Sequence, residues 1–185
     1  KHGYRGNPYH NYIHACDVTH TVYRLMCETM GGRWLNAVEQ YALLVSALCH
    51  DIGHPGRSNN FLVEAQDELA ILYNDQSPLE NMHCAQLFSI CSIAETNIFK
   101  ALSKDQEYKV ARKVCIAAIL HTDMVHHFDM VKHLVQLYEM QVAVCDAQAL
   151  EDQNLKPEFE AEIFRKDQQF WIELLLHLAD VSNAT

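Results

Sequence analysis

The chain has 185 residues, 49% of them apolar and 21% charged, which is the balance of a globular domain rather than of a disordered segment. Its formal charge of -10 offers no basic face for a nucleic acid, and no apolar run is long enough to span a membrane. Twelve histidines are the unusual feature, and they make metal binding the first chemistry to consider.

Apolar residues recur at helical spacing along the whole chain and, with only 6 Gly and 4 Pro, predict a compact all-α fold. The first helix is expected over Asn11–Met30, ended by Gly31–Gly32. Its apolar stripe comprises Ile13, Val18, Val22, Leu25 and Met26. A second helix over Ala37–Cys49 is apolar on nearly every face, which predicts a position in the middle of the domain.

Turn residues and helix-start signals divide the rest of the chain. Gly53–Asn60 is expected to form a loop, and Leu62–Tyr73 a helix. Capping boxes at Ser77–Glu80, with Pro78 in the first helical position, and at Ser103–Gln106 predict two further helix starts. The remaining predicted segments are a helix from Ser103 to Leu120, a helix over Met124–Val144, a polar linker over Asp146–Pro157 and a helix over Glu160–Val181.

Seven cysteines without a CxxC pair, mostly among apolar neighbours, favour buried free thiols of a reducing compartment over a disulfide framework or a cysteine zinc cluster. The chain begins with Lys1 rather than Met and has no apolar segment typical of a signal peptide. These features predict an excerpt of a longer cytoplasmic protein.

Histidines and aspartates gather at three places along the predicted helices. His10 and His14 are one helical turn apart, His50 and Asp51 end the most buried helix just before His54, and His177 and Asp180 lie three residues apart. A buried carboxylate is costly unless something compensates its charge. Imidazole nitrogen and carboxylate oxygen together bind divalent metals, so the three clusters favour one shared metal site. The alternatives are a capping Asp51, a hydrogen-bonded core His50 and a structural ion pair of Asp180.

Six motifs, in order and spanning nearly the whole chain, resemble signatures of the class I cyclic nucleotide phosphodiesterases. Tyr9–Val18 reads YHNYIHACDV, and His50–Gly56 reads HDIGHPG, followed by Asn59, which resembles the family's version of the HD metal signature. The other four are YND at Tyr73–Asp75, LEN at Leu79–Asn81, TDM at Thr122–Met124 and HLADVSN at His177–Asn183. The resemblance implies an HD-type phosphodiesterase fold. Residues 1–185 would be the N-terminal and central part of one catalytic domain, without its C-terminal helices.

The resemblance also implies the chemistry, which is hydrolysis of 3′,5′-cyclic nucleotides to 5′-monophosphates at two divalent ions. His14, His50, Asp51 and Asp180 would bind the first ion, Zn²⁺. Asp51 would bridge to the second, Mg²⁺ or Mn²⁺. A hydroxide bridging the two ions would attack the phosphorus, and His10 would be the general acid that protonates the departing 3′ oxygen.

Six further residues have implied roles around this centre. His54, Glu80 and Thr122 would hold waters of the second ion, and Tyr9, Met124 and Asn183 would face the nucleotide. Simpler roles are equally open, as helix caps for Glu80 and Thr122 and as a core residue for Met124.

The chain departs from the family pattern at several positions. The family usually has ENHH where Glu80–His83 reads ENMH, so Met82 replaces a histidine expected to hold a water of the second ion. The purine-binding glutamine of the family lies beyond residue 185, so a preference for cAMP or cGMP cannot be predicted. Four histidines, His20, His126, His127 and His133, match no family site and are expected to be exposed.

Two alternatives to a cyclic nucleotide phosphodiesterase stay open at this point. Another HD-type nucleotide phosphohydrolase would share His50–Asp51 but has no need of the motifs around His10 and Thr122. A silent nucleotide-binding relative would keep the fold, but such relatives commonly lose a metal ligand or the general acid. All of those residues are present here, which favours an active enzyme.

Overall fold

The computed structural model describes residues 1–29, 31–102, 105–151 and 166–182, and their regular secondary structure is all helical, without strands. The α-helices are α1 (Tyr12–Glu28), α2 (Gly31–Trp34), α3 (Ala37–Cys49), α4 (Asn59–Glu64), α5 (Glu68–Leu72), α6 (Pro78–Cys91), α7 (Asp105–Leu120), α8 (His127–Glu151) and α10 (Gln168–Ser182). Two short 3₁₀ turns, η1 (Ile98–Ala101) and η2 (Met124–His126), precede α7 and α8. None of the described helices is both long and apolar enough to cross a bilayer.

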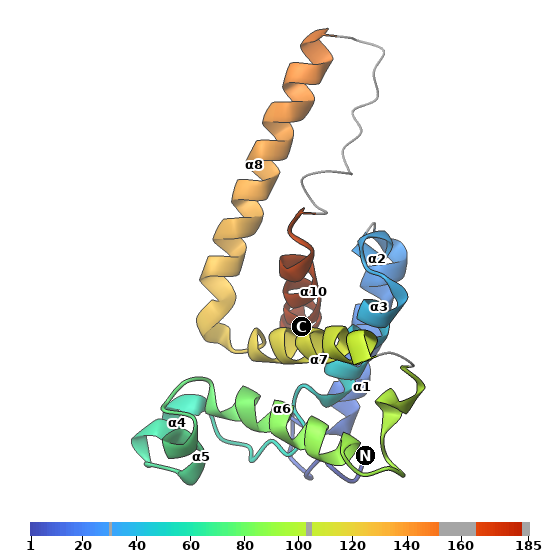
Figure 1. The fold of residues 1–185 in the computed structure, drawn as a ribbon. Helices are drawn as coiled ribbons and strands as arrows, with labels where there is room; N and C mark the ends of the chain where they lie inside the picture. Colours follow the sequence, from blue (N-terminus) through green and yellow to red (C-terminus); the bar gives the residue numbers. More distant parts are fainter. Residues whose placement is uncertain (30, 103–104, 152–165, 183–185) are drawn as a thin grey trace.

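The predicted all-α class is thus confirmed, and so is the central position of α3. This helix packs against α1, α6, α7 and α10, and its Ala42, Leu43 and Ala47 are fully buried. In Figure 1 the α6 and α7 helices run across the molecule, and α3 and α10 rise above α7. The α1 helix packs against both α3 and α10. The main core fills the space between them, so the end of α3 lies deep inside the fold.

Several predicted boundaries are wrong by a few residues, for local reasons. The first helix ends at Glu28, because Thr29 has extended backbone angles, and Gly31–Gly32 already belong to α2. The predicted helix Leu62–Tyr73 is two short helices, because Gln66 turns the chain with a φ of 52°. The α4 helix begins at Asn59 inside the predicted loop, since the Ser58 hydroxyl accepts the Phe61 N–H.

The capping box predicted at Ser77–Glu80 is also wrong, although the helix starts there with Pro78 in its first turn. Ser77 has left-handed backbone angles and makes no side-chain cap. The Leu79 N–H donates instead to Asn59 Oδ1, 20 residues earlier in the chain. The start of α6 is therefore capped by a distant residue, which leaves the Glu80 carboxylate free for other contacts.

The C-terminal third differs from the prediction in a similar way. The predicted helix from Met124 begins as the turn η2 and continues as α8 to Glu151, so residues 146–151 are helical rather than a linker. The α10 helix ends one residue beyond its predicted end, at Ser182. The capping box at Ser103 and the rest of the predicted linker lie outside the described residues.

Candidate active site

Three helices bring the predicted metal ligands to one point. His14 lies in the first turn of α1, where the Asn11 side chain accepts the N–H groups of Ile13 and His14. This cap turns His14 into the core, and Ile13, expected to belong to the apolar stripe, is exposed instead. His50 and Asp51 follow α3 directly, and Asp180 lies near the end of α10.

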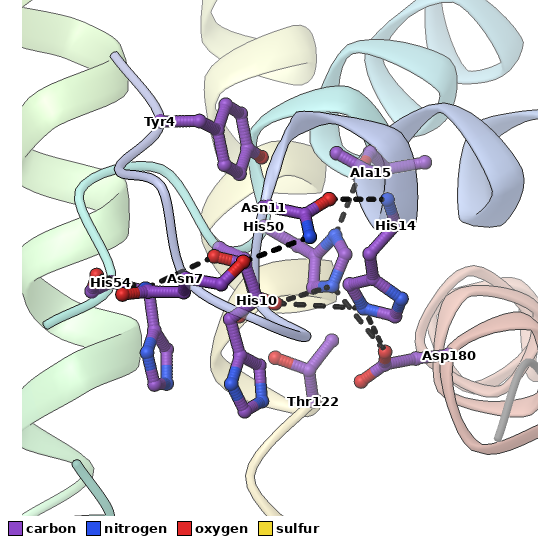
Figure 2. Close-up of polar contacts among 12 residues, drawn as sticks. Tyr4, Asn7, His10, Asn11, His14, Ala15, His50, His54, Thr122 and Asp180 are labelled. Carbon is purple, nitrogen blue, oxygen red and sulfur yellow. Dashed lines mark hydrogen bonds and ion pairs between the residues drawn. The ribbon is translucent and has the colours of Figure 1, made fainter. Parts of the chain in front are cut away.

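The four side chains contact one another around a common centre, at which Figure 2 shows His14, His50 and Asp180. His14 Nε2 lies 3.0 Å from Asp180 Oδ1 and 3.5 Å from Asp51 Oδ2. His50 Nε2 lies 3.4 Å from each of the same two oxygens. The structure thus places together all four residues that the resemblance assigned to the first ion. His14, His50 and Asp180 by themselves could hold an ion with one atom each.

The backbone fixes which nitrogen of His50 faces this centre. His50 Nδ1 lies 2.8 Å from the Ala47 carbonyl oxygen, which can only accept, so Nδ1 carries the hydrogen. Nε2 is therefore directed at the carboxylates, and both His50 Nε2 and Asp51 Oδ2 are buried without a hydrogen-bond partner. Buried polar atoms without partners are rare in native proteins, and a cation among them would satisfy both.

Charge at the centre also favours a cation. Burial raises the pKa of the Asp51 and Asp180 carboxyls, but the adjacent imidazoles outweigh it and leave both pKa values below their ordinary range. Conversely, burial lowers the pKa of His50, but the two carboxylates raise it well above its usual value. Two ionised carboxylates that hold a proton on a fully buried imidazole would attract a divalent cation in the same way.

A second group of possible ligands shares Asp51 with the first. Asp51, His54 and His83 each offer one atom, and these atoms lie within 4.8 Å of one another. His83 is buried, donates Nδ1–H to the Ile52 carbonyl at 2.7 Å, and places Nε2 3.8 Å from Asp51 Oδ1. Burial lowers the pKa of His83 to about 4, so its ring is neutral and can bind a metal ion.

Sequence reasoning missed His83 and assigned the contact with the second ion to the neighbouring position 82. Met82, expected to stand where a histidine holds a water of the second ion, is buried with Leu62, Ala70 and Leu79. Successive helical residues point about 100° apart, so only one of the two can face Asp51. Met82 therefore lies outside the group of side chains around Asp51. His83 is the last residue of the same ENMH motif, and this position was the signal that could have identified it.

His54 has a different tautomer from its neighbours. The Gly56 N–H donates to His54 Nδ1 at 3.0 Å, so in the neutral ring the hydrogen lies on Nε2. Burial lowers the pKa of His54 to about 4, which keeps the ring neutral. An Nε2–H donates a hydrogen bond and does not bind a metal directly. This agrees with the implied role of His54 as a partner of metal-bound water.

Asn59 connects two carboxylates at the side of the centre. Its Nδ2 lies 2.8 Å from Glu80 Oε2 and 3.2 Å from Asp123 Oδ2, while its Oδ1 caps α6. Burial raises the pKa of Glu80 to about 7, although the Asn59 hydrogen bond lowers it. Glu80 therefore exchanges a proton near neutral pH and can act as donor or acceptor towards a water.

The predicted general acid, His10, lies in the segment before α1 and is held there by Asn7. Asn7 Nδ2 donates to the His10 carbonyl at 3.1 Å and to the His54 carbonyl at 2.8 Å, which ties two distant segments together (Figure 2). Asn11 Nδ2 in turn donates to the Asn7 carbonyl at 3.0 Å. Gly56 has a φ of +77°, and a Cβ there would lie 3.2 Å from Asn7 Oδ1. Sequence reasoning did not identify Asn7.

A cavity of about 430 Å³ opens above these groups. Of the predicted residues, it is lined by His10, Asp51, His54, Glu80, Thr122, Met124 and Asp180. The Thr122 hydroxyl donates to the Ile119 carbonyl, and Met124 is 56% exposed at the rim. Tyr9 is not among the lining residues, and its ring packs against those of His10 and His14. Asn183 lies outside the described residues. Arg57, which no motif singled out, adds a guanidinium to the lining.

The remaining histidines are not all exposed as predicted. His20 is exposed, but His127 is partly buried, with its Nδ1 2.9 Å from Nε2 of His177. His133 forms an ion pair with Asp167, with its Nε2 2.8 Å from Oδ2. These contacts join α8 to α10 and to the residue that precedes it, which the sequence spacing alone could not show. The described cysteines carry free thiols, and of these Cys84, Cys91 and Cys115 are buried as predicted while Cys27 is exposed.

The chain is similar to proteins of one family along nearly its whole length. The sequence model of the family described as 3'5'-cyclic nucleotide phosphodiesterase matches residues 9–185. The 3',5'-cyclic-nucleotide phosphodiesterase regA of Dictyostelium discoideum is 45% identical over 68% of this chain and 16% of its own length. The dual specificity calcium/calmodulin-dependent 3',5'-cyclic nucleotide phosphodiesterase 1B of Bos taurus is 39% identical over 97% of this chain and 29% of its own.

A solved structure shares the fold. The phosphodiesterase domain of the RhoPDE fusion protein from the choanoflagellate Salpingoeca rosetta matches with a TM-score of 0.80 and 34% identity, over 98% of this chain and 52% of that one. The chain thus spans about half of that solved domain and less than a third of the curated relatives named above.

Proposed function

The chain belongs to the 3'5'-cyclic nucleotide phosphodiesterase family, and on this premise we propose that it contributes the metal centre and the general acid of an enzyme that hydrolyses 3′,5′-cyclic nucleotides to 5′-monophosphates. The observation that carries the proposal is the buried centre of His14, His50, Asp51 and Asp180, with unpartnered Nε2 and Oδ2 atoms below a cavity that His10 lines.

The donor atoms support a Zn²⁺ ion at the first group of ligands and a Mg²⁺ or Mn²⁺ ion at the second. Two imidazole nitrogens and two carboxylate oxygens form a set that suits Zn²⁺, which prefers four ligands of this kind. The group that shares Asp51 supplies one carboxylate, and Asp51 and His54 line the cavity, so waters would complete the shell of a Mg²⁺ or Mn²⁺ ion there. Bound there, such ions supply Lewis-acid activation of water and of the phosphoryl oxygens.

His10 supplies the proton in the proposed reaction. Water adds to the phosphorus, the bond from phosphorus to the ribose 3′ oxygen breaks, and that oxygen takes a proton as it leaves. His10 lines the cavity beside Asp51 and Asp180, and its place is fixed by the hydrogen bond from Asn7. An imidazole can donate a proton near neutral pH, which makes His10 the donor in this scheme.

The other lining residues are proposed to hold waters and to orient the nucleotide. His54 donates its Nε2–H, and Glu80 and Thr122 offer oxygens, to waters beside the second group of ligands. Met124 offers an apolar contact and Arg57 a positive charge at the cavity, where a purine and an anionic phosphate would enter. Tyr9 and Asn183 are proposed to complete the nucleotide pocket, as the resemblance implies.

Residues 1–185 are further proposed to be the N-terminal and central part of one catalytic domain. The match to about half of a solved phosphodiesterase domain at a TM-score of 0.80 supports this assignment. A cytoplasmic location remains a prediction from the free thiols.

Metal analysis and hydrolysis assays on the intact protein test the proposal. Elemental analysis should find Zn²⁺ or a similar transition ion, and chelation should abolish hydrolysis of cAMP or cGMP until metal is added back. Turnover that persists in verified metal-free protein would contradict the metal centre. Nucleotide binding without turnover would indicate the silent relative. Hydrolysis of nucleotide monoesters alone would indicate another HD-type phosphohydrolase.

A further inference from the structure

The long helix α8 has two apolar faces, and only one of them is covered by the described part of the chain. Met130, Leu134 and Leu137 pack with Phe170, Trp171 and Leu174 of α10. A second row of large apolar side chains is exposed, with exposed fractions that reach 81% at Phe128 and 64% at Tyr138. This outer stripe consists of Phe128, Val131, Val135, Tyr138 and Val142. In Figure 1, α8 stands at the outer edge of the fold, so another molecule could approach it.

The spacing within the outer stripe is that of a coiled coil. Its members follow one another at steps of three, four, three and four residues, so they occupy the a and d positions of successive heptads. A surface helix of a single domain needs one apolar face, and α8 already has that face against α10. The extra row therefore has the pattern with which one helix packs along another.

Charged residues beside the outer stripe indicate which helix packs along α8. Lys132 and Glu139 occupy successive e positions and flank the stripe on the side away from the covered face. Both are exposed, and among the described residues neither forms an ion pair within the chain. In an antiparallel pair of helices, e positions face e positions. Lys132 of one copy then meets Glu139 of the other, twice by symmetry.

A parallel pair would lack this match. There, e positions face g positions, which are Leu134 and Gln141 in α8, and both turn towards the protein's own interior. The antiparallel register places Val135 against the partner's Tyr138 and Val131 against the partner's Val142, so each of the two tyrosines at the centre of the seam meets a smaller valine. A stripe that complements itself in both shape and charge is expected of a twofold interface.

We propose that the outer stripe of α8 binds a second copy of this chain, with the two helices antiparallel. The stripe runs over 15 residues, about 21 Å of helix, so the contact is short and its dissociation constant is expected in the micromolar range. The proposal is independent of the catalytic assignment, because α8 supplies none of the proposed metal ligands.

Charge reversal in the intact protein, followed by sedimentation velocity over a range of concentrations, tests the proposal. Lys132→Glu alone and Glu139→Lys alone should each raise the dissociation constant by about tenfold or more, because each replaces two attractions by two repulsions. The double variant Lys132→Glu/Glu139→Lys should restore wild-type association. Val135→Glu should abolish it, whereas Ile71→Ser, which removes an even more exposed apolar side chain from α5, should leave it unchanged.

Circular dichroism of each variant establishes that it is folded, so a loss of association is not a loss of structure. A monomeric wild-type chain at high micromolar concentration would overturn the proposal. Association that ignores Val135→Glu, or that the double reversal fails to restore, would also overturn it, because the contact would then lie elsewhere or have another geometry. In the intact protein, a monomer whose Tyr138 is protected from solvent would likewise overturn it, since another segment of the same chain would cover the stripe.

Discussion

The imidazole ring of His10 lies face to face on that of His54, with ring centroids 3.9 Å apart and planes 13° apart. Two positively charged rings could not share this arrangement. Burial lowers the pKa of His54 to about 4, so His54 is neutral at physiological pH and a proton on His10 meets no like charge across the stack. In this pair the neutral ring of His54 packs against the ring of His10, which is the proposed proton donor.

Replacing His10 by Asn should lower kcat by roughly 10²–10⁴-fold while bound metal is retained, because His10 is assigned to proton donation and not to the metal centre. His14→Asn should instead release the first ion, since it removes a nitrogen that contacts both carboxylates. Metal content and kcat, measured on the same samples, separate the two roles. Loss of metal from the His10 variant with retention in the His14 variant would mean that the roles are reversed.

Asn7→Ala should lower kcat by about tenfold and leave metal content unchanged. The substitution removes the two hydrogen bonds that join the His10 and His54 segments, and a small displacement of a catalytic group is costly in rate. Asn97→Ala is the matched control, because Asn97 caps η1 and is absent from the cavity lining. Equal losses in the two variants would indicate a general loss of stability, which thermal unfolding would reveal.

Glu80→Gln should change how stability depends on pH in chelated protein. Burial raises the pKa of Glu80 from 4.5 to about 7 in the folded state. Between these values the folded state holds a proton that the unfolded state has lost, so wild-type stability falls as pH rises through this window. At about 1.4 kcal/mol for each pKa unit, the loss is at most about 3.5 kcal/mol.

The Gln variant cannot ionise at this position and should lose less stability over the same range. Urea unfolding at pH 5 and pH 8 measures the difference. Parallel curves for the two proteins would show that Glu80 has an ordinary pKa.

Met82→His should lower stability, whereas His83→Ala should weaken ion binding. A histidine at position 82 would enter the apolar cluster of Leu62, Ala70 and Leu79, so it should cost about 1–3 kcal/mol of stability without strengthening ion binding. His83→Ala should weaken binding of a second ion by about 10–100-fold, since His83 Nε2 faces Asp51. Titration with Mg²⁺ or Mn²⁺ of each variant, loaded with one equivalent of Zn²⁺, gives the affinities. Tighter ion binding by the Met82→His variant would show that a side chain at position 82 does reach the water shell of the second ion.

The sequence by itself determined the helical class, the central helix and most of the residues that converge. Periodicity and helix-start signals report local preferences, which is why α1, α3 and α6 appear within a few residues of their predicted positions. The four ligands that the resemblance implied, His14, His50, Asp51 and Asp180, do meet around one centre. The spacing of histidines and aspartates alone had left structural roles for Asp51, His50 and Asp180 open.

Only the tertiary structure decided the contacts between segments far apart in the chain. The cap of α6 comes from Asn59 rather than Ser77, and the segment around His10 is held by Asn7, because each hydrogen bond crosses at least 20 residues or joins two loops. The choice of His83 over Met82 depended on the rotation of one helix relative to Asp51. Local patterns specify which face of a helix is apolar, but the packing of the whole domain decides what each side chain meets.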